Sequence, residues 1–261
     1  MAARLLLLSL LFATAPAAAR AAEPITICAD PEPPPWNFWK RDKNGEPTRE
    51  LVGFSVDLMR KLFKRQGREV RFITGRPWAR CLYDVRKHEV GFAMDIYKDG
   101  IRAPLYLFSL PYNTLTPQLF TLRDHPIQVD SPEDLKRYKG CGIYGASYAH
   151  YGLRDQDLDL SANGYVGVIA KLKNHYCDYF VEELEILAGY RLMNEDFLDD
   201  AELAHRPLKG AASPSLHLIT AKDGPDAALM PGIDDAIESM DKSGELAALW
   251  RKYAGDIPYN R

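Results

Sequence analysis

The sequence of 261 residues predicts an α/β protein built from two similar lobes. Short apolar or β-branched runs alternate with segments whose apolar residues recur at helical spacing, and this alternation occurs twice along the chain. Helices between successive strands favour parallel pairing with right-handed crossovers. Two lobes of this kind leave a cleft between them, which is the usual place for a small ligand.

The first half of the chain reads as strand, helix, strand, helix, strand. "PITICAD" (24–30) predicts the first strand, the prolines of "PEPPPWNFW" (31–39) predict an extended loop, and Asn44-Gly45 predicts a turn. The following elements are a helix in "VGFSVDLMRKLFKRQG" that ends at Gly67, a strand in "EVRFIT", a helix in "RPWARCLYDVRKHE", and strands in "VGFAMDIY" and "TPQLFTLR".

The same pattern then restarts. "SPEDLKRY" predicts a helix with Ser131 as its N-cap. The rest of the chain predicts a strand in "CGIYGAS", a helix in "YVGVIAKLKNHY", a strand in "CDYFVEE", a helix in "ELEILAGYRLM", a strand in "SLHLITAK", and two C-terminal helices hinged at Ser243-Gly244.

The first residues predict export. Arg4, an apolar run from Leu5 to Phe12 and the A-x-A pattern at 19–21 form a signal peptide over residues 1–21, cleaved after Ala21 or, alternatively, after Ala22. Later runs fall short of the roughly 18 apolar residues of a membrane span. We therefore expect a soluble mature chain.

Charge and histidine placement exclude two classes of partner. The formal net charge is −3, and loss of Arg4 and Arg20 brings it to about −5. Charges of both signs are mixed along the chain, which argues against nucleic acid or an anionic membrane surface. The six histidines show no ligand spacing, so we expect no metal and no cofactor.

Four cysteines predict disulfides in an exported chain. They are Cys28, Cys81, Cys141 and Cys177, and four cysteines allow three connectivities. The alternative is that they are buried thiols that pack as small apolar groups.

One arginine opens the apolar segment "GIRAPLYLFSLPY" (100–112). Arg102 cannot lose its proton, so a partly buried position requires an anion. Either the chain or a ligand must supply that anion.

Five segments in order carry a resemblance that spans nearly the whole mature chain: "LVGFSVDLMRKL", "GIRAPLYLFSLPY", "SPEDLKRYKGCGIYGAS", "CDYFVEE" and "KSGELAALWRKYAG". With them the chain resembles the type II periplasmic solute-binding proteins of the amino-acid-binding family. The resemblance implies the two-lobe type II fold, with each lobe a mainly parallel sheet flanked by helices. It also implies lobe 1 at 22–113 plus 214–261 and lobe 2 at 114–213.

The function that this resemblance implies is periplasmic binding of a small polar ligand that carries a carboxylate, such as an amino acid, in the cleft between lobes. The bound form would serve an inner-membrane ABC permease or a sensor protein, and the protein would be a monomer without enzymatic activity. The alternative is a periplasmic cyclohexadienyl-type dehydratase on the same fold, in which Glu183 would be the general acid.

Three residues match the ligand positions of the family. The resemblance implies that Arg102 binds the ligand carboxylate; the alternative is an ion pair with Asp95 or Asp99. It implies that Glu183 accepts the ligand ammonium, although this residue could instead open the next helix. Ser147 would bind the carboxylate near a helix N-terminus, or serve as an N-cap.

Other positions depart from the family pattern. Pro33 occupies the place of an aromatic residue that stacks on the ligand, and Trp36 either replaces that residue or packs in the core. Asp95, Tyr97 and Tyr148 stand where small hydroxyl residues are usual.

The element "RPWARC" adds Arg76 and Arg80, of which we expect Arg80 at the ligand. For the cysteines, the family topology implies the pairs Cys28–Cys81 and Cys141–Cys177.

Overall fold

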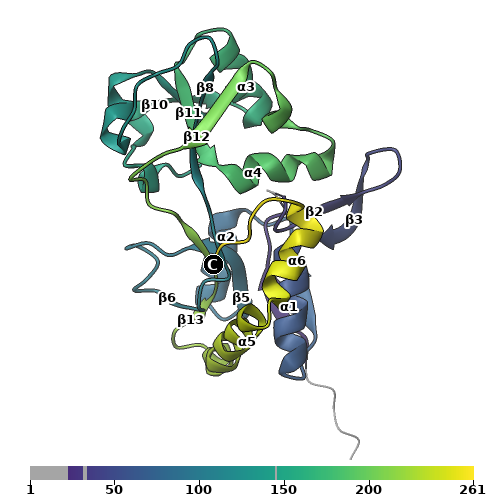
Figure 1. The fold of residues 1–261 in the computed structure, drawn as a ribbon. Coiled ribbons are helices and arrows are strands. Elements are labelled where there is room, and N and C mark those ends of the chain that lie inside the picture. Colours follow the sequence, from purple (N-terminus) through teal and green to yellow (C-terminus); the bar gives the residue numbers. More distant parts are fainter. Residues whose placement is uncertain (1–22, 32–33, 145) are drawn as a thin grey trace, which may run out of the picture.

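The computed structural model describes residues 23–31, 34–144 and 146–261. The predicted signal peptide at 1–21 and Pro33 lie outside the described residues. The described chain forms an α/β fold with two main sheets, one in each of two parts that Figure 1 shows one above the other. We call the part with the six-stranded sheet the first lobe and the part with the five-stranded sheet the second lobe.

The sheet of the first lobe has the order β4-β1-β5-β13-β6, and β7 also pairs with β13. Strand β1 (Ile25–Cys28) is parallel to β4 (Val70–Ile73) and to β5 (Phe92–Tyr97). Strand β13 (Ser215–Ala221) runs antiparallel to its neighbours β5, β6 (Tyr106–Phe108) and β7 (Asn113–Thr114).

The sheet of the second lobe has the order β10-β9-β11-β8-β12. Its parallel strands are β10 (Leu158–Ala162), β9 (Gly140–Ile143) and β11 (Tyr179–Glu183). Strand β8 (Pro117–Leu122) is antiparallel to β11 and to β12 (Leu203–Pro207). Both sheets are therefore mixed, not mainly parallel, because the strands that carry the chain between lobes, β8 and β13, run against their neighbours.

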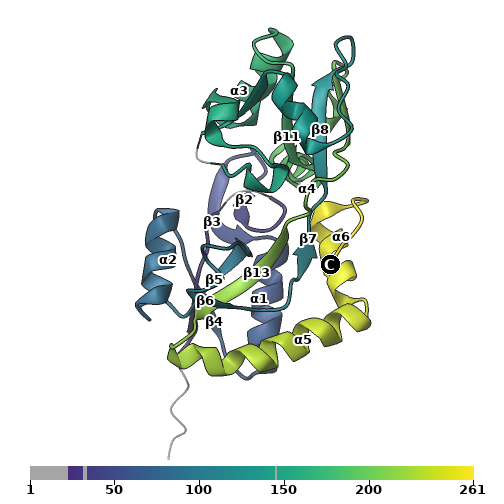
Figure 2. The ribbon, with the colours of Figure 1, turned by 90° about the vertical axis from the view of Figure 1, so that its left-hand side faces the viewer.

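Helices flank both sheets. In the first lobe, α2 (Trp78–Arg86) lies on one side of the sheet, and α1 (Phe54–Arg65), α5 (Met230–Lys242) and α6 (Glu245–Ala254) lie on the other (Figure 2). In the second lobe, α3 (Gly164–Lys173) packs on the sheet, and α4 (Leu184–Gly189) faces α6 of the first lobe (Figure 1). The short 3-10 helices are η1 (Pro132–Arg137), η2 (Ala149–Tyr151), η3 (Asp155–Asp157), η4 (Tyr190–Met193), η5 (Phe197–Asp199) and η6 (Pro225–Leu229).

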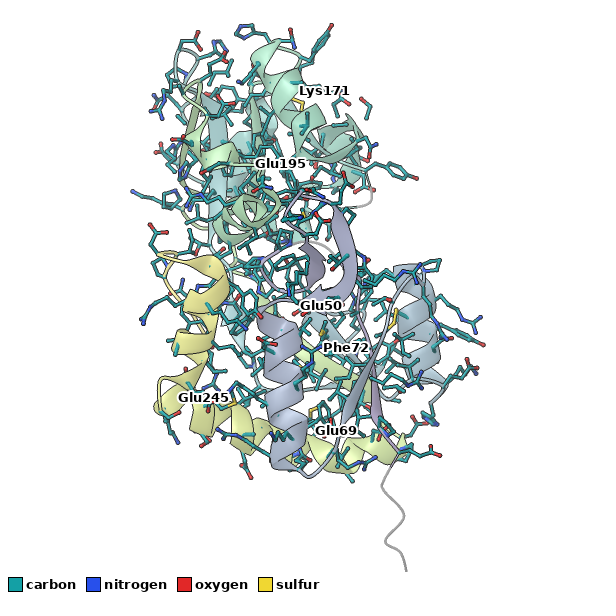
Figure 3. The ribbon with its side chains drawn as sticks, turned by 90° about the vertical axis from the view of Figure 1, so that its right-hand side faces the viewer. Glu50, Glu69, Phe72, Lys171, Glu195 and Glu245 are labelled. Carbon is teal, nitrogen blue, oxygen red and sulfur yellow. A yellow bond between two sulfur atoms is a disulfide. The ribbon has the colours of Figure 1, made fainter. Side chains whose placement is uncertain are left out.

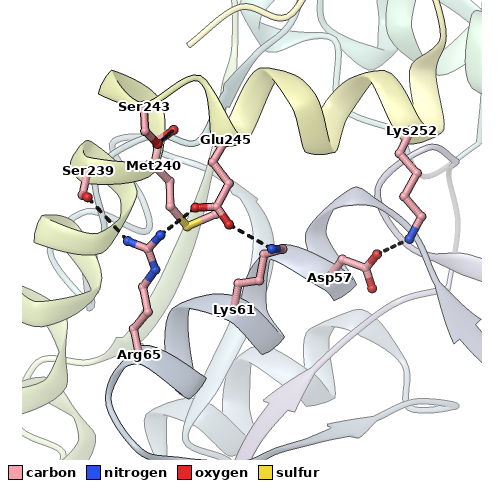
Figure 4. A network of polar contacts seen from close by, with 8 residues as sticks. All are labelled: Asp57, Lys61, Arg65, Ser239, Met240, Ser243, Glu245 and Lys252. Carbon is pink, nitrogen blue, oxygen red and sulfur yellow. Dashed lines mark hydrogen bonds and ion pairs between the residues drawn. The ribbon is translucent and has the colours of Figure 1, made fainter.

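Helix α1 shows how the apolar pattern produces the core. Its periodic residues Val56, Leu58, Met59, Leu62 and Phe63 are all fully buried. On its outer side, Figure 4 shows a polar network that joins α1 to the C-terminal helices. Exposed ion pairs of this kind contribute about 0–1 kcal/mol each, so the buried face supplies most of the attachment.

The network in Figure 4 includes three ion pairs and a hydrogen bond from Arg65 to Ser239. Glu245 contacts Lys61 Nζ at 2.8 Å and Arg65 Nη2 at 2.6 Å, and Lys252 Nζ contacts Asp57 at 2.6 Å. These contacts link residues about 180 positions apart, and they place the returning C-terminal segment against the first helix of the first lobe.

Some predicted elements differ from the structure. Residues 132–137 form the 3-10 helix η1, not an α-helix, and Ser131 shares a capping box with Asp134. The polar segment after the prolines forms a hairpin of β2 (Phe38–Arg41) and β3 (Pro47–Val52), with the Asn44-Gly45 turn at its tip. The hairpin lies outside both main sheets, so its strands carry charged residues and little apolar pattern. The sequence therefore did not indicate them as strands.

Both disulfides implied by the family topology are formed. Cys28 on β1 pairs with Cys81 on α2, and Cys141 on β9 pairs with Cys177 just before β11. Each bridge stays within one lobe. Figure 3 draws the side chains of both lobes, with Lys171 in the second and Phe72 and Glu245 in the first.

Candidate functional site

A cavity of about 720 Å³ lies between the two lobes. The first lobe contributes most of its wall, the second lobe contributes residues of the loop after β9 and of α4, and the segment that returns to the first lobe contributes the rest. The lining residues are Asp30, Trp36, Asn37, Trp78, 94–99, Arg102, Leu115, Ala146, Ser147, Ala149, His150, Ile186 and 212–217.

Arg102 lines this cleft with a side chain that is 29% exposed. Its Nη1 contacts Asp99 Oδ2 at 3.2 Å and donates to the Tyr97 carbonyl at 3.3 Å. The Asp99 carboxylate also accepts from the backbone N–H of Arg102 at 2.7 Å, which holds it in place. Within the described residues both guanidinium contacts use Nη1, which leaves the other N–H groups of this cleft-lining residue with capacity to bind an anion.

Asp95 does not pair with Arg102. Its carboxylate accepts from Ser55 Oγ at 2.5 Å, from the Tyr112 hydroxyl at 2.8 Å and from Asn37 Nδ2 at 2.8 Å. Burial raises the pKa of Asp95 to about 6, although these three hydrogen bonds lower it.

A register shift between β13 and β5 explains how the Asp95 side chain reaches these donors. The shift lies between His217 and Ile219, opposite Asp95, whose φ of 62° is in the left-handed region. The irregularity redirects the side chain toward Ser55 and Tyr112.

Glu183 does not line the cleft. It is 2% exposed, and its Oε1 accepts from the Tyr151 hydroxyl at 2.9 Å and contacts His150 Nε2 at 2.6 Å. His150 does line the cleft. Burial lowers the pKa of His150 to about 4, against the opposing charge of Glu182, so the imidazole is neutral and donates Nε2–H to the Glu183 carboxylate.

Glu182 is buried as well, although neighbouring strand residues usually point to opposite faces. Its Oε2 accepts from the Tyr165 hydroxyl at 2.6 Å, and its Oε1 accepts from the Glu183 backbone N–H at 3.1 Å. Burial and then the charge of Glu183 raise the pKa of Glu182 well above its usual value. The second lobe therefore holds two adjacent carboxyl groups beneath its cleft surface.

Tyr97 and His150 face each other across the cleft. Their ring centroids are 5.9 Å apart at 72°, and the two rings come from different lobes. Burial and then the charge of Glu183 raise the pKa of Tyr97 well above 10. The sequence did not indicate His150 as a site residue, because the histidines are scattered and show no spacing pattern.

Ser147 lines the cleft, and the residue is exposed. The helix N-terminus that we expected near Ser147 is that of η2, a 3-10 helix of three residues whose N-cap is Tyr148, not Ser147. Tyr148 lies in the core of the second lobe. It is 4% exposed, and its hydroxyl accepts from the Ile143 backbone N–H at 2.7 Å.

Trp36 lines the cleft but is only 2% exposed. Its Nε1 donates to Asn113 Oδ1 at 2.7 Å, and its ring packs against Trp250 at 5.9 Å. This geometry favours the core alternative, since the polar end of the indole is already bonded within the first lobe.

Arg80 and Arg76 do not line the cleft. Both bind Asp84, which is fully buried on α2; the Arg80 Nε contact is 2.6 Å. The element "RPWARC" thus neutralises a buried carboxylate and supplies Cys81 to a disulfide. Only its Trp78 reaches the cleft wall.

A family model of bacterial extracellular solute-binding proteins, family 3, matches residues 25–256. The chain belongs to this family. It is therefore a solute-binding protein, and membership of an extracellular family makes it a secreted or periplasmic protein. Within the residues that the structure describes, no helix is long and apolar enough to cross a membrane.

Solved structures share the fold of this solute-binding protein. The binding protein AbpA of an amino acid ABC transporter from Streptococcus pneumoniae, bound to L-arginine, is 20% identical, with a TM-score of 0.68 over 88% of this chain and 94% of that one. A structure from work on glutathione import via GshT and the cystine importer TcyBC of Streptococcus mutans is 16% identical, with a TM-score of 0.69 over 92% and 98%.

A third match is part of a histidine kinase. The sensor domain of a histidine kinase, described as similar to periplasmic binding proteins, is 23% identical, with a TM-score of 0.67 over 90% of this chain and 97% of that one. A search of curated proteins finds no match.

Proposed function

We propose that this solute-binding protein captures a small ligand with a carboxylate group, such as an amino acid, in the cleft between its lobes. Arg102 binds the carboxylate. The observation that carries this proposal is the placement of Arg102 on the cleft wall, where its contacts with the described part of the chain use Nη1. A guanidinium offers two parallel N–H bonds to a carboxylate, which sets the orientation of the ligand as well as its charge.

The second lobe completes the site through Ser147 and His150. Ser147 is an exposed residue on the cleft, and the His150 ring lies beside that of Tyr97. Glu183 then has a positioning role, because its carboxylate holds His150 and Tyr151 at 2.6 and 2.9 Å without reaching the cleft wall. Asp95 acts similarly in the first lobe, where it holds Asn37.

Closure of the two lobes around the ligand is the proposed mechanism. The chain crosses between the sheets at 114–117 and again at 207–215, which supports lobes at 22–113 plus 214–261 and at 114–213. Two such connections allow one lobe to rotate against the other, and contacts from both lobes to one ligand favour the closed state.

Transport or sensing is the proposed use of the closed form. The partner is an inner-membrane ABC permease or a sensor protein, the protein is a periplasmic monomer, and it performs no chemistry on its ligand. Dehydratase activity would require a general acid at the substrate. Glu183 lies behind His150 and off the cleft surface, which argues against that role.

A thermal-shift screen of amino acids, polyamines and organic acids tests this proposal. A carboxylate-bearing compound that binds the native state should raise the melting temperature, since ligand binding stabilises the folded form by mass action. Small-angle scattering with that compound should then show a smaller radius of gyration. Stabilisation by polyamines alone, or an unchanged radius at saturation, would contradict the proposal.

A further inference from the structure

Asn37 lies in the cleft wall directly before strand β2, and it is 3% exposed. Its Nδ2 donates to Asp95 Oδ2 at 2.8 Å. An ionised carboxylate only accepts hydrogen bonds, so this contact determines which end of the amide faces Asp95. The carbonyl oxygen Oδ1 is therefore turned away from Asp95.

This Oδ1 is buried and has no hydrogen-bond partner in the part of the chain that the structure describes. Other buried side-chain atoms without a hydrogen bond belong to residues away from the cleft: Arg41, Gln66, Arg68 and Tyr179, together with Asp84, whose carboxylate already has an ion pair with Arg80. Nearly all buried polar atoms in proteins are bonded, because an unpaired one is costly. An unpaired acceptor on a residue of the cleft wall calls for a donor that arrives with the ligand.

The carboxyl groups near this part of the cleft wall also favour a hydrogen-bond donor on the ligand next to Asn37. Tyr97 is two residues beyond Asp95 on β5, and its pKa is raised first by burial and then by the nearby carboxyl groups of Glu183, Glu182, Glu185 and Asp95. Arg102 follows the end of that strand and bonds the Tyr97 carbonyl. Along β5 and the segment after it, the wall thus changes from acceptors near Asp95 to the cations Lys98 and Arg102.

The spacing indicates which part of a ligand would reach Asn37. Asn37 is bonded to Asp95, whereas Arg102 is bonded to the carbonyl of Tyr97, two residues further along β5. Two residues along a strand span at most roughly 7 Å. A ligand whose carboxylate is held at Arg102 has its α-ammonium close to that carboxylate, so the group near Asn37 belongs to the far end of the molecule.

We propose that Asn37 Oδ1 binds an N–H donor on the side chain of the ligand, so that the cleft selects carboxylate-bearing compounds with a distal ammonium, guanidinium or amide group. This inference rests on the proposed function and narrows its ligand class. Asn37 determines specificity, whereas Arg102 supplies the common anchor.

Calorimetric titration with two matched pairs of probes tests the inference: L-glutamine against L-glutamate, and L-lysine against L-norleucine. In each pair the first compound carries the distal N–H donor. The wild-type protein should bind the first member of at least one pair about tenfold or more tightly than the second, because a lost hydrogen bond to a buried acceptor has that magnitude. Asn37→Ala should abolish this preference.

Ser55→Ala is the matched control. Ser55 is another donor to the Asp95 carboxylate, so its loss disturbs the same network but leaves Asn37 Oδ1 in place. The double variant Asn37→Asp/Asp95→Asn reverses the hydrogen bond between these two residues and keeps an acceptor oxygen at position 37, so it should retain the preference for lysine. This variant covers the case in which Asn37→Ala fails to fold.

Three results would overturn the inference. The first is Arg102-dependent binding of both members of each pair with equal affinity, which would leave the proposed function standing. The second is a preference that survives in a folded Asn37→Ala, or that disappears in Ser55→Ala or in the folded double variant Asn37→Asp/Asp95→Asn. The third is no binding of any probe, which would count against the proposed function as well.

Discussion

Glu185 holds Thr116 by two hydrogen bonds. Its Oε2 accepts from the Thr116 backbone N–H at 2.9 Å, and its Oε1 accepts from the Thr116 hydroxyl at 2.7 Å. Glu185 lies in the first turn of α4 and is 2% exposed, whereas Thr116 lies where the chain enters the second lobe. These two hydrogen bonds connect the start of α4 in the second lobe to the segment between β7 and β8, about which the lobes would rotate.

The first prediction concerns this pair. Glu185→Ala should lower the free energy of unfolding by about 1–3 kcal/mol, because it leaves the partly buried backbone N–H of Thr116 without its partner. Glu185→Gln should stay within about 1 kcal/mol of wild type, since the amide oxygen can accept from the N–H and the amide NH₂ can donate to the hydroxyl. Urea unfolding measures both values. Equal destabilisation by the two variants would show that the two bonds do not stabilise the fold.

The second prediction concerns Asp95 and pH. Its folded pKa of about 6 lies above the ordinary value of 3.8, so between pH 4 and 6 the folded protein holds a proton that the unfolded chain has lost. The free energy of unfolding therefore decreases as the pH rises through this range, by up to about 3 kcal/mol. Asp95→Asn should lack this decrease.

His150 acts in the opposite direction over an overlapping range, since its lowered pKa makes the folded state gain stability as the pH rises from 4. The measurement is therefore the difference between the two stability curves, in which the contribution of His150 cancels. The Asn variant should gain on wild type between pH 4 and 6. Parallel curves would contradict a raised pKa at Asp95.

The third prediction concerns the disulfides. Their partners are separated by 53 and 36 residues, and closing loops of that size gives roughly 3–4 kcal/mol per bridge. The double variants Cys28→Ser/Cys81→Ser and Cys141→Ser/Cys177→Ser should each lose stability of that order. Mass spectrometry of unreduced peptides from the exported protein should find these two pairs, and a bridge between the lobes would refute the assignment.

The sequence predicted most of the framework, because strong periodicity survives without tertiary information. The five apolar residues of α1 are all buried as their spacing required. The hairpin β2–β3 was missed, since its charged residues carry little apolar pattern. Residues 132–137 had a sound helical start, yet they form only a 3-10 helix.

The candidate site was harder to predict than the fold. Arg102 lies on the cleft, but Arg80 binds Asp84, and Tyr148 lies in the core of the second lobe. A sequence pattern can place a residue near the end of a strand, but it does not show which group will form a hydrogen bond or an ion pair with its side chain. The roles of Asn37 and His150 depend on contacts between segments far apart in the chain, which no local pattern reports.

The ligand contact of Arg102 is the central claim, and calorimetric titration of wild type, Arg102→Ala and Arg102→Lys tests it most directly. The titrant is the carboxylate compound that gives the largest thermal shift, and a melting curve of each variant shows whether it is folded. Arg102→Ala should lose roughly thirtyfold or more in affinity while remaining folded, because one partner of a desolvated charge pair is removed. Arg102→Lys should recover only part of this loss, since an ammonium cannot form the fork. Wild-type affinity in a folded Arg102→Ala variant would contradict the account.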